Sequence, residues 1–213
     1  RAMDLTAPAG IWYQLLDGRG NQAVTTKLAL AENARVRLVQ LLKAPADRSL
    51  YSRVEVSCAE NARFSLTQIL LGDGDLYVDT AVTLGGDGSV FEADLGYLGR
   101  NTQTLDMNVA VDHFGKNTER RINTSGALMD GAKKIFRGTI DFKTGSAGSV
   151  GNEKETVLLL GDDVVNKTVP LILCAEENVV GNHGATIGQL DDASVFYFES
   201  RGIEKALAEH ILA

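Results

Sequence analysis

The segment Ala31-Glu-Asn-Ala-Arg35 recurs in the same chain as Ala59-Glu-Asn-Ala-Arg63, an offset of 28 residues. Each copy has a leucine three residues further on, at Leu38 and Leu66. A fixed period of roughly 20 to 50 residues is typical of stacked coils, in which each coil buries its apolar face only against its neighbours. The repeat therefore predicts a solenoid.

Alternation of apolar and polar residues dominates the chain until about residue 175. It is clear in Arg35–Leu42, Tyr51–Cys58 and Leu76–Leu84, and glycine-rich turns such as Gly72–Asp75 and Gly85–Gly88 separate these stretches. Period-two alternation rich in β-branched residues predicts strands. No amphipathic run between them is long enough for a crossover helix, so a βαβ sheet is disfavoured. For an all-β chain the repeat indicates a β-helix, and a β-sandwich is the alternative.

The sequence changes character near residue 190. Asp191–Arg201 begins with helix-capping acids and is followed by Gly202, a natural helix-ending residue. Glu204–Ala213 predicts a second helix with acids in its first turn. We therefore expect a mainly β chain, with a β-helix core over residues 1–190 and a short C-terminal α-helical hairpin over residues 191–213. Because the second helix reaches the last residue, we interpret the chain as a fragment or a trimmed form.

The composition disfavours several classes of function. The 213 residues carry a net charge of −7, which opposes binding to nucleic acid or anionic membranes. No window approaches the roughly 20 apolar residues of a membrane span, and the first residues lack the layout of a signal peptide. The two cysteines, Cys58 and Cys174, cannot form a disulfide framework. We expect a cytoplasmic protein with no nucleic-acid partner and no membrane partner.

The common catalytic signatures are absent from the sequence. It has no phosphate-binding loop, no dinucleotide fingerprint, no G-x-S-x-G, no H-E-x-x-H and no C-x-x-C. The three histidines, His113, His183 and His210, are too few and too scattered for a zinc site within the chain. The motifs therefore indicate a protein that is not an enzyme.

One segment stands out from this background: Asn182-His-Gly-Ala-Thr-Ile-Gly-Gln-Leu-Asp191, followed by Val195-Phe-Tyr-Phe-Glu-Ser-Arg-Gly-Ile203. His183 lies among small residues before the predicted helix. Neutral imidazole binds iron well, so His183 is a candidate ligand of a metal ion or cluster. The alternative is a histidine that is hydrogen-bonded in the corner between the last strand and the first helix.

The segment from His183 to Ile203 resembles the C-terminal signature of the SufB/SufD family, the paired scaffold subunits of SUF iron–sulfur cluster assembly. That signature combines a His-Gly-Ala-Thr-x-Gly-x-Leu/Ile-Asp run with a Phe-Tyr-x-x-Ser-Arg-Gly-Ile run. Ala127–Gly138 similarly resembles a family coil that ends in Phe-x-Gly. SufD is the better match, because Gly184 follows the histidine where SufB has Glu, and residues 151–163 contain no cysteine.

This resemblance covers roughly residues 50–213 and implies a right-handed parallel β-helix. It also implies a non-catalytic scaffold whose C-terminal helices bind a SufC-type ABC ATPase. Family members are about twice as long and have an N-terminal helical domain, which this sequence lacks. The other scaffold partner is therefore a SufB-like protein or a second copy of this chain. The open β-helix edge favours a homodimer when the chain is alone.

The residues that the resemblance places at the ATPase are Phe196, Tyr197, Phe198, Arg201 and Gly202. An aromatic cluster with an arginine is typical of an interface hot spot. Tyr197 and Arg201 are four residues apart and share one helix face. The alternative for Phe196 and Phe198 is that they attach the hairpin to the β-helix.

The resemblance also places His183 at the interface between scaffolds, where Glu176, Glu177 and Cys174 could add ligands. One chain cannot complete a cluster with these residues, so we expect no tightly bound cofactor. A transient iron–sulfur cluster at a shared interface is the expectation. The alternation of Cys174 with neighbouring leucines favours a buried core thiol instead, and Cys58 is interpreted in the same way.

Two further functions are kept as alternatives. A β-helix carbohydrate-active enzyme would need clustered acids along one face of the coils. Asp73, Asp75, Asp79 and Asp87 supply acids, but glycine-rich turns favour aspartate for local reasons. A structural β-helix that associates with itself and has no assembly role is the other alternative.

Overall fold

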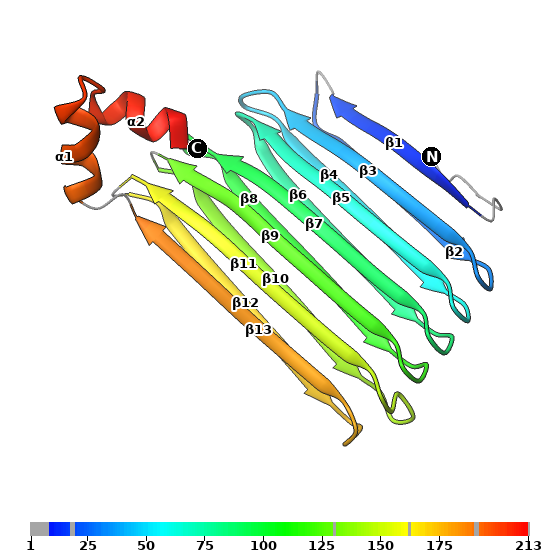
Figure 1. The fold of residues 1–213 in the computed structure, drawn as a ribbon. Coiled ribbons are helices and arrows are strands. Elements are labelled where there is room, and N and C mark those ends of the chain that lie inside the picture. Colours follow the sequence, from blue (N-terminus) through cyan, green and yellow to red (C-terminus); the bar gives the residue numbers. More distant parts are fainter. Residues whose placement is uncertain (1–8, 18–19, 130, 162, 190–191, 213) are drawn as a thin grey trace.

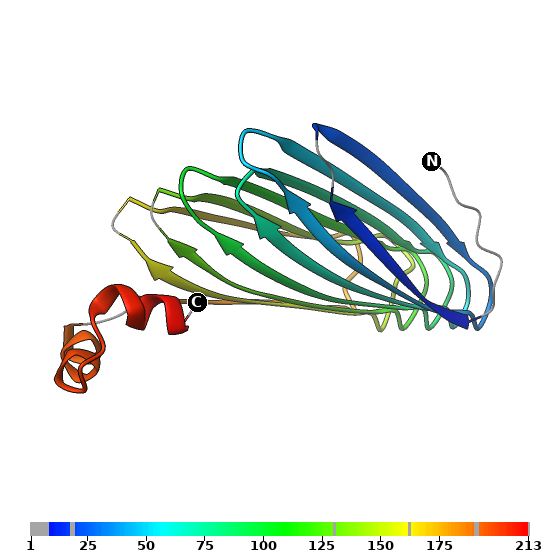
Figure 2. The same cartoon turned by 90° about the horizontal axis from the view of Figure 1, so that it is seen from above.

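The computed structural model describes the chain except for residues 1–8, 18–19, 130, 162, 190–191 and 213. In the described part, strands stack side by side from β1 at one end to β13 at the other (Figure 1). They form two layers when the molecule is seen from above, and the two helices extend past the strand ends (Figure 2). The proposed boundary between core and hairpin, residues 190 and 191, lies outside the described residues.

The strands alternate between two sheets along the chain. The odd-numbered strands form a seven-stranded sheet in sequence order: β1 (Ala9–Asp17), β3 (Arg35–Ala44), β5 (Arg63–Gly72), β7 (Val90–Gly99), β9 (Glu119–Met129), β11 (Val150–Leu160) and β13 (Val180–Gln189). The even-numbered strands form a six-stranded sheet: β2 (Gln22–Leu30), β4 (Ser49–Cys58), β6 (Asp75–Leu84), β8 (Thr104–His113), β10 (Lys133–Phe142) and β12 (Val165–Cys174). Two successive strands therefore make one coil.

Every strand pairing in the described part is parallel and joins one coil to the next. The two copies of the sequence repeat lie directly over each other, since Arg35 pairs with Arg63. The predicted parallel β-solenoid is confirmed, with about six turns. The alternative β-sandwich is wrong, because sandwiches are built from antiparallel strands.

The asparagine of each repeat lies in a turn and has a left-handed backbone conformation. Asn33 and Asn61 have φ of 60° and 55°, and Gly88 takes the same place in the next coil with φ of 66°. Each donates its backbone N–H to the coil that follows: Asn33 to the Glu60 carbonyl at 2.9 Å and Asn61 to the Asp87 carbonyl at 2.9 Å. Asn and Gly tolerate this conformation better than other residues. The turns therefore form a ladder of their own.

Stacked residues of the same kind fill the interior. The rings of Phe64 and Phe91 stack with centroids 5.6 Å apart. Gln68 Nε2 donates to Gln40 Oε1 at 2.7 Å, and Gln40 Nε2 donates to Gln14 Oε1 at 2.6 Å. Buried amides are tolerated when they are hydrogen-bonded, and identical side chains one coil apart provide these partners.

The two helices predicted near the C-terminus are present in the described residues. Helix α1 spans Asp192–Ser200 and helix α2 spans Lys205–Leu212. Gly202 has φ of 78° and donates its N–H to the Glu199 carbonyl at 2.9 Å. Ile203 N–H reaches the Phe198 carbonyl at 3.0 Å, as in a Schellman ending. Among the described residues, no helix is long and apolar enough to cross a membrane.

We predict that His113 makes the protein less stable in acid. Burial, with the nearby charge of Arg120 adding to it, lowers the pKa of His113 from 6.5 to about 4. Between these values the unfolded chain binds more protons, so the free energy of unfolding should fall by about 3 kcal/mol as pH drops from 6.5 to 4. His113→Phe, which matches Phe142 one coil further on, should remove this contribution.

Urea unfolding of both proteins across this pH range checks the prediction. Thr118 keeps a partner in the variant, because its hydroxyl also lies 2.7 Å from Ser149 Oγ. An unchanged pH slope in His113→Phe would contradict it.

Candidate functional site

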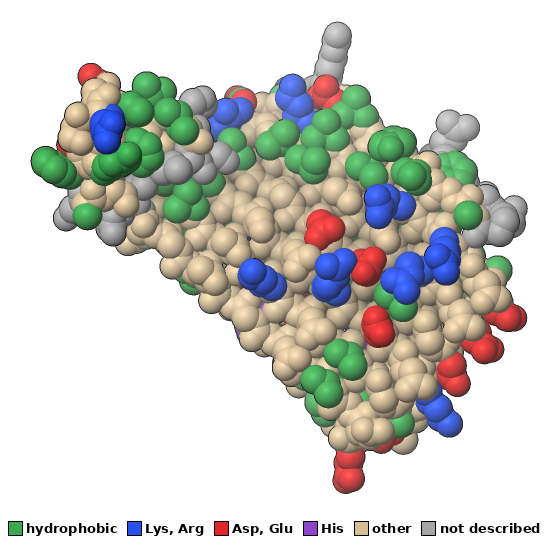
Figure 3. All heavy atoms as spheres, viewed as in Figure 1, with side chains coloured by type: hydrophobic (Ala, Val, Ile, Leu, Met, Phe, Trp, Pro, Cys, Tyr) green, Lys and Arg blue, Asp and Glu red, His purple; other side chains and the backbone are tan. Residues whose placement is uncertain are grey.

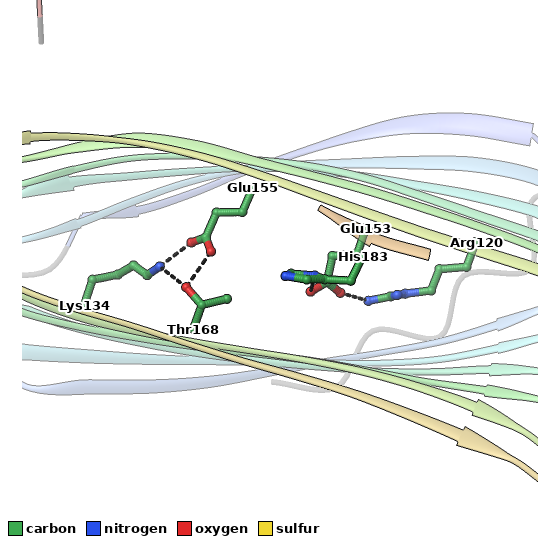
Figure 4. Close-up of polar contacts among 6 residues, drawn as sticks. All are labelled: Arg120, Lys134, Glu153, Glu155, Thr168 and His183. Atoms are coloured by element: carbon green, nitrogen blue, oxygen red, sulfur yellow. Dashed lines mark hydrogen bonds and ion pairs between the residues drawn. The ribbon is translucent and has the colours of Figure 1, made fainter. Parts of the chain in front are cut away.

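The inward-facing side chains change from apolar to charged towards the C-terminal coils. Arg120 on β9, Lys134 on β10, and Glu153 and Glu155 on β11 are all buried inside the solenoid. Buried charges are costly unless they are paired and hydrogen-bonded. Figure 4 shows that these residues form two neighbouring polar groups between the sheets.

In the first group Glu153 lies between Arg120 and His183 (Figure 4). Glu153 and His183 are register partners on β11 and β13, and both belong to the inward-facing row. Arg120 Nη2 forms an ion pair with Glu153 Oε2, and His183 Nδ1 lies 3.2 Å from Glu153 Oε1. The side chains of Arg120 and Glu153 are 0% and 1% exposed, and that of His183 is 20% exposed. The group thus connects the interior with the surface of the last coil.

Gly138 on β10 makes room for this carboxylate. A Cβ at Gly138 would lie 2.0 and 2.2 Å from the two oxygens of Glu153. Side chains cannot approach that closely, so a larger residue would push Glu153 out of its place. The glycine of the Phe136-Arg-Gly138 motif therefore has a packing role across the interior.

In the second group Glu155 accepts from Lys134 Nζ and from the hydroxyl of Thr168. Lys134 Nζ and Glu155 Oε1 form an ion pair in which both side chains are 0% exposed. Thr168 Oγ1 lies 2.5 Å from Glu155 Oε2 and 3.2 Å from Lys134 Nζ. Burial lowers the pKa of Lys134, and its hydrogen bond to Glu155 partly offsets this. The triad satisfies both oxygens of a fully buried carboxylate.

The expected cluster ligands lie near the open end of the solenoid but do not converge. Cys174 ends β12 and is exposed, so the interpretation as a buried thiol is wrong for it, whereas Cys58 is buried as expected. The cause is position: β12 is the terminal strand of its sheet, and no coil covers the cysteine in the described part of the chain. Glu176 and Glu177 lie in the turn after β12. A hydrogen bond from the Gly145 N–H lowers the pKa of Glu176.

The described residues contain no group of three or more His, Cys, Asp or Glu side chains that could hold a metal ion. His183 is the fourth residue of β13 and contacts Glu153, whereas Glu176 and Glu177 lie in the turn before that strand. The described residues alone therefore do not make up a cluster site.

Of the expected ATPase-binding residues, Phe196, Tyr197 and Phe198 lie on α1, and Arg201 follows directly after its last residue. Phe196 and Tyr197 are 72% and 57% exposed, so Phe196 does not attach the hairpin to the β-helix. The Arg201 guanidinium lies 5.4 Å from the centre of the Tyr197 ring, and Phe198 packs edge-on against Tyr197 at 5.9 Å. Figure 3 shows hydrophobic side chains at the surface of this hairpin. Gly202 follows them at the turn.

The four acids of the carbohydrate-enzyme alternative each have a structural partner. Asp73 forms a 2.7 Å ion pair with the Arg100 Nε. The remaining contacts join each acid to the next coil: Asp75 Oδ1 to Thr104 N at 2.8 Å, Asp79 Oδ1 to Asn108 Nδ2 at 2.9 Å and Asp87 Oδ1 to Lys116 N at 2.8 Å. These partners lie one coil away in the stack and are not local, and Asp75 and Asp79 belong to strand β6, so stacking between coils and not turn chemistry holds these acids.

The buried polar groups are not evident in the amino-acid sequence. In β11 the charged residues Glu153, Lys154 and Glu155 follow one another, so alternation alone does not show which of them face inward. Lys133 and Lys134 are likewise adjacent on β10. The one available signal was Gly138, whose place in a strand indicates a close approach by another group.

We predict that the Lys134–Glu155 pair is worth little as a pair but is costly to break. Lys134→Met leaves the Glu155 charge buried without a cation and should lower the free energy of unfolding by about 3–5 kcal/mol. The double variant Lys134→Met/Glu155→Leu should recover most of this loss. Urea unfolding measures both, and Lys27→Met, which breaks an exposed pair with Glu55, should have little effect. A double variant no more stable than Lys134→Met would contradict the prediction.

The chain is similar to known iron–sulfur cluster assembly proteins. Residues 11–213 match the family model described as SUF system FeS cluster assembly, SufBD core domain. SufD of Bacillus subtilis strain 168 is 31% identical over 143 residues, which are 67% of this chain and 33% of that protein. SufD of Escherichia coli K12 is 25% identical over 143 residues, 67% of this chain and 34% of that protein.

A chloroplastic SufBD family protein of Arabidopsis thaliana is 31% identical over 133 residues, 62% of this chain and 24% of that protein. The matched part of this chain thus spans about a third or less of these relatives. The family match itself covers nearly the whole chain, and the β-solenoid that the resemblance implied is present. The chain therefore belongs to the SufBD core family of SUF iron–sulfur cluster assembly, and it is SufD-like.

Proposed function

We propose that this chain is a non-catalytic scaffold of SUF-type iron–sulfur cluster assembly that works in the cytoplasm. In this proposal its C-terminal hairpin binds a SufC-type ABC ATPase, and the open end of its solenoid pairs with another scaffold subunit. The family match over residues 11–213 carries the proposal.

The surface of α1 supports the ATPase contact. Phe196 and Tyr197 present large apolar areas to solvent, and Arg201 lies on the ring of Tyr197. In protein interfaces a few residues carry most of the free energy of binding. Aromatic residues and arginine are enriched among them. The hairpin extends past the strand ends, where a partner can reach it (Figure 2).

The terminal strands support the pairing of scaffolds. Within the described residues β12 and β13 each have a strand neighbour on one side only. The outward-facing residues Val169, Leu171 and Leu173 of β12 are 52%, 46% and 43% exposed. An open, apolar strand edge is a ready template for pairing with another chain. A SufB-like scaffold or a second copy of this chain would cover it.

The iron–sulfur cluster is cargo in this proposal, held transiently between two scaffolds. His183 belongs to the last coil and is partly exposed there, and Cys174 and Glu177 are exposed at the same end of the stack. Since these residues do not form a complete ligand set, the partner supplies the rest. The four acids with structural partners give the carbohydrate-enzyme alternative no comparable support.

We predict that Arg201→Glu weakens binding to the SufC-type ATPase from the same source. The change reverses the charge beside Tyr197 and should raise the dissociation constant at least about tenfold. Co-purification and titration with wild type and variant measure this. Arg37→Glu is the matched control, because Arg37 is exposed on the outer face of β3, on the solenoid and not on the hairpin. Equal binding by wild type and Arg201→Glu would refute this docking surface.

We also predict that the chain without partners forms a dimer through its last coil. Leu171→Lys adds a charge to the exposed edge strand β12 and should shift the protein to monomers. Light scattering after size exclusion gives the mass of each species. Leu71→Lys, at a similarly exposed leucine on β5, should leave the dimer intact. A monomeric wild type at every concentration would contradict the pairing of two copies.

A further inference from the structure

We propose that Glu153 and Arg120 are positioning residues that hold His183 in a single tautomer, with hydrogen on Nδ1 and a free lone pair on Nε2. In that form Nε2 is the atom through which the last coil binds a transition-metal ion. That this metal ion belongs to an iron–sulfur cluster, carried as cargo, rests on the proposed function. The tautomer does not depend on it and can be measured without any partner.

The hydrogen-bond chemistry of the carboxylate determines the tautomer. Glu153 Oε2 is paired with the Arg120 guanidinium, and Glu153 Oε1 lies 3.2 Å from His183 Nδ1. A carboxylate paired with a guanidinium is ionised and can only accept hydrogen bonds. In the neutral imidazole Nδ1 is therefore the donor, and Nε2 keeps the lone pair that a metal ion needs.

Burial and the ion pair with Arg120 restrain the carboxylate in this position. Its side chain is 1% exposed, and its two oxygens lie against Gly138, where even a Cβ would not fit. The side chain of Arg120 is 0% exposed. Burial lowers the pKa of Arg120, and the contact with Glu153 partly offsets this lowering. Separating this pair would leave two buried charges uncompensated, so the pair holds the oxygen that faces His183 in place.

The backbone fixes the other partner. His183 and Glu153 are register partners on neighbouring parallel strands, so their side chains leave the sheet on the same face and side by side. β13 is the terminal strand of its sheet, and the His183 side chain is 20% exposed. One nitrogen of the His183 ring thus faces a buried carboxylate, while the His183 side chain is partly exposed at the surface.

Metal-binding histidines commonly donate their second N–H to a carboxylate, which fixes the ring and raises the basicity of the ligating nitrogen. Loss of such a carboxylate typically costs about 10- to 100-fold in metal affinity. The same loss is expected here for a metal ion that binds at His183 Nε2.

The test compares ring tautomers in ¹⁵N-histidine-labelled protein. Long-range ¹H–¹⁵N correlations distinguish a protonated from an unprotonated ring nitrogen, and His183→Gln identifies the signals. Wild type should show a protonated Nδ1 and an unprotonated Nε2. Arg120→Met/Glu153→Leu removes the acceptor together with the opposing charge, so that no buried charge is left alone. This variant should lose the fixed tautomer.

A conservative variant separates positioning from a merely structural role. Arg120→Met/Glu153→Gln is also free of a buried charge but retains an acceptor oxygen towards Nδ1. It should restore the Nδ1–H form that Arg120→Met/Glu153→Leu has lost. Circular dichroism of the three proteins shows whether each of them is folded.

Titration with Co²⁺ alone, followed on the His183 ring signals, provides the second measurement. The dissociation constant should rise about 10- to 100-fold from wild type to Arg120→Met/Glu153→Leu. A wild type with hydrogen on Nε2, or an unchanged tautomer and Co²⁺ affinity in that variant, would overturn the inference. Neither readout uses the ATPase, so a failure to bind the ATPase would refute the docking proposal and leave the inference standing.

Discussion

The parallel register between coils is the constraint on which the rest of the structure depends. Each strand inside a sheet is hydrogen-bonded to the strand one coil before it and to the strand one coil after it, so each of its inward side chains has neighbours of fixed identity. The turns obey the same rule, since Asn33 and Asn61 each donate to the coil that follows. An inward side chain must therefore pack or hydrogen-bond with the side chains at the same position in the neighbouring coils. This explains the stacked rings of Phe64 and Phe91 and the hydrogen bond between Gln40 and Gln68.

The same constraint places the buried charged side chains and His183 near one end of the stack. A charged side chain inside a solenoid must find its partner one coil away or on the facing sheet, because water is excluded there. Glu153 finds its cation one coil away, at Arg120 on β9, and Glu155 finds its cation on the facing sheet, at Lys134 on β10. Where the stack ends, a row has only one neighbour. His183 therefore combines a buried hydrogen-bond partner with contact to solvent, which a residue in a central coil cannot do.

The open end and the hairpin also agree with the family. Members of the SufBD core family are named for iron–sulfur cluster assembly, and the signature from His183 to Ile203 runs from the last strand through α1. The proposed scaffold role requires surfaces for partners and no closed active site. An uncovered strand edge, a partly exposed histidine and exposed aromatic residues on α1 are surfaces of that kind. The signature thus links the end of the stack to the hairpin that follows it.

Features that depend on neighbours along the chain could be predicted from the amino-acid order. The repeat at Ala31 and Ala59 revealed the coils because stacking requires equivalent residues at a fixed offset, and Gly202 marked the end of α1 because few other residues adopt its backbone conformation. The polar groups around Glu153 and Glu155 depend on contacts across the interior with residues on other strands. Because charged residues follow one another in β11, the alternation of apolar and polar residues does not show which of them face inward. The exposure of Cys174 depends on its position in the last coil of its sheet, which only the tertiary structure shows.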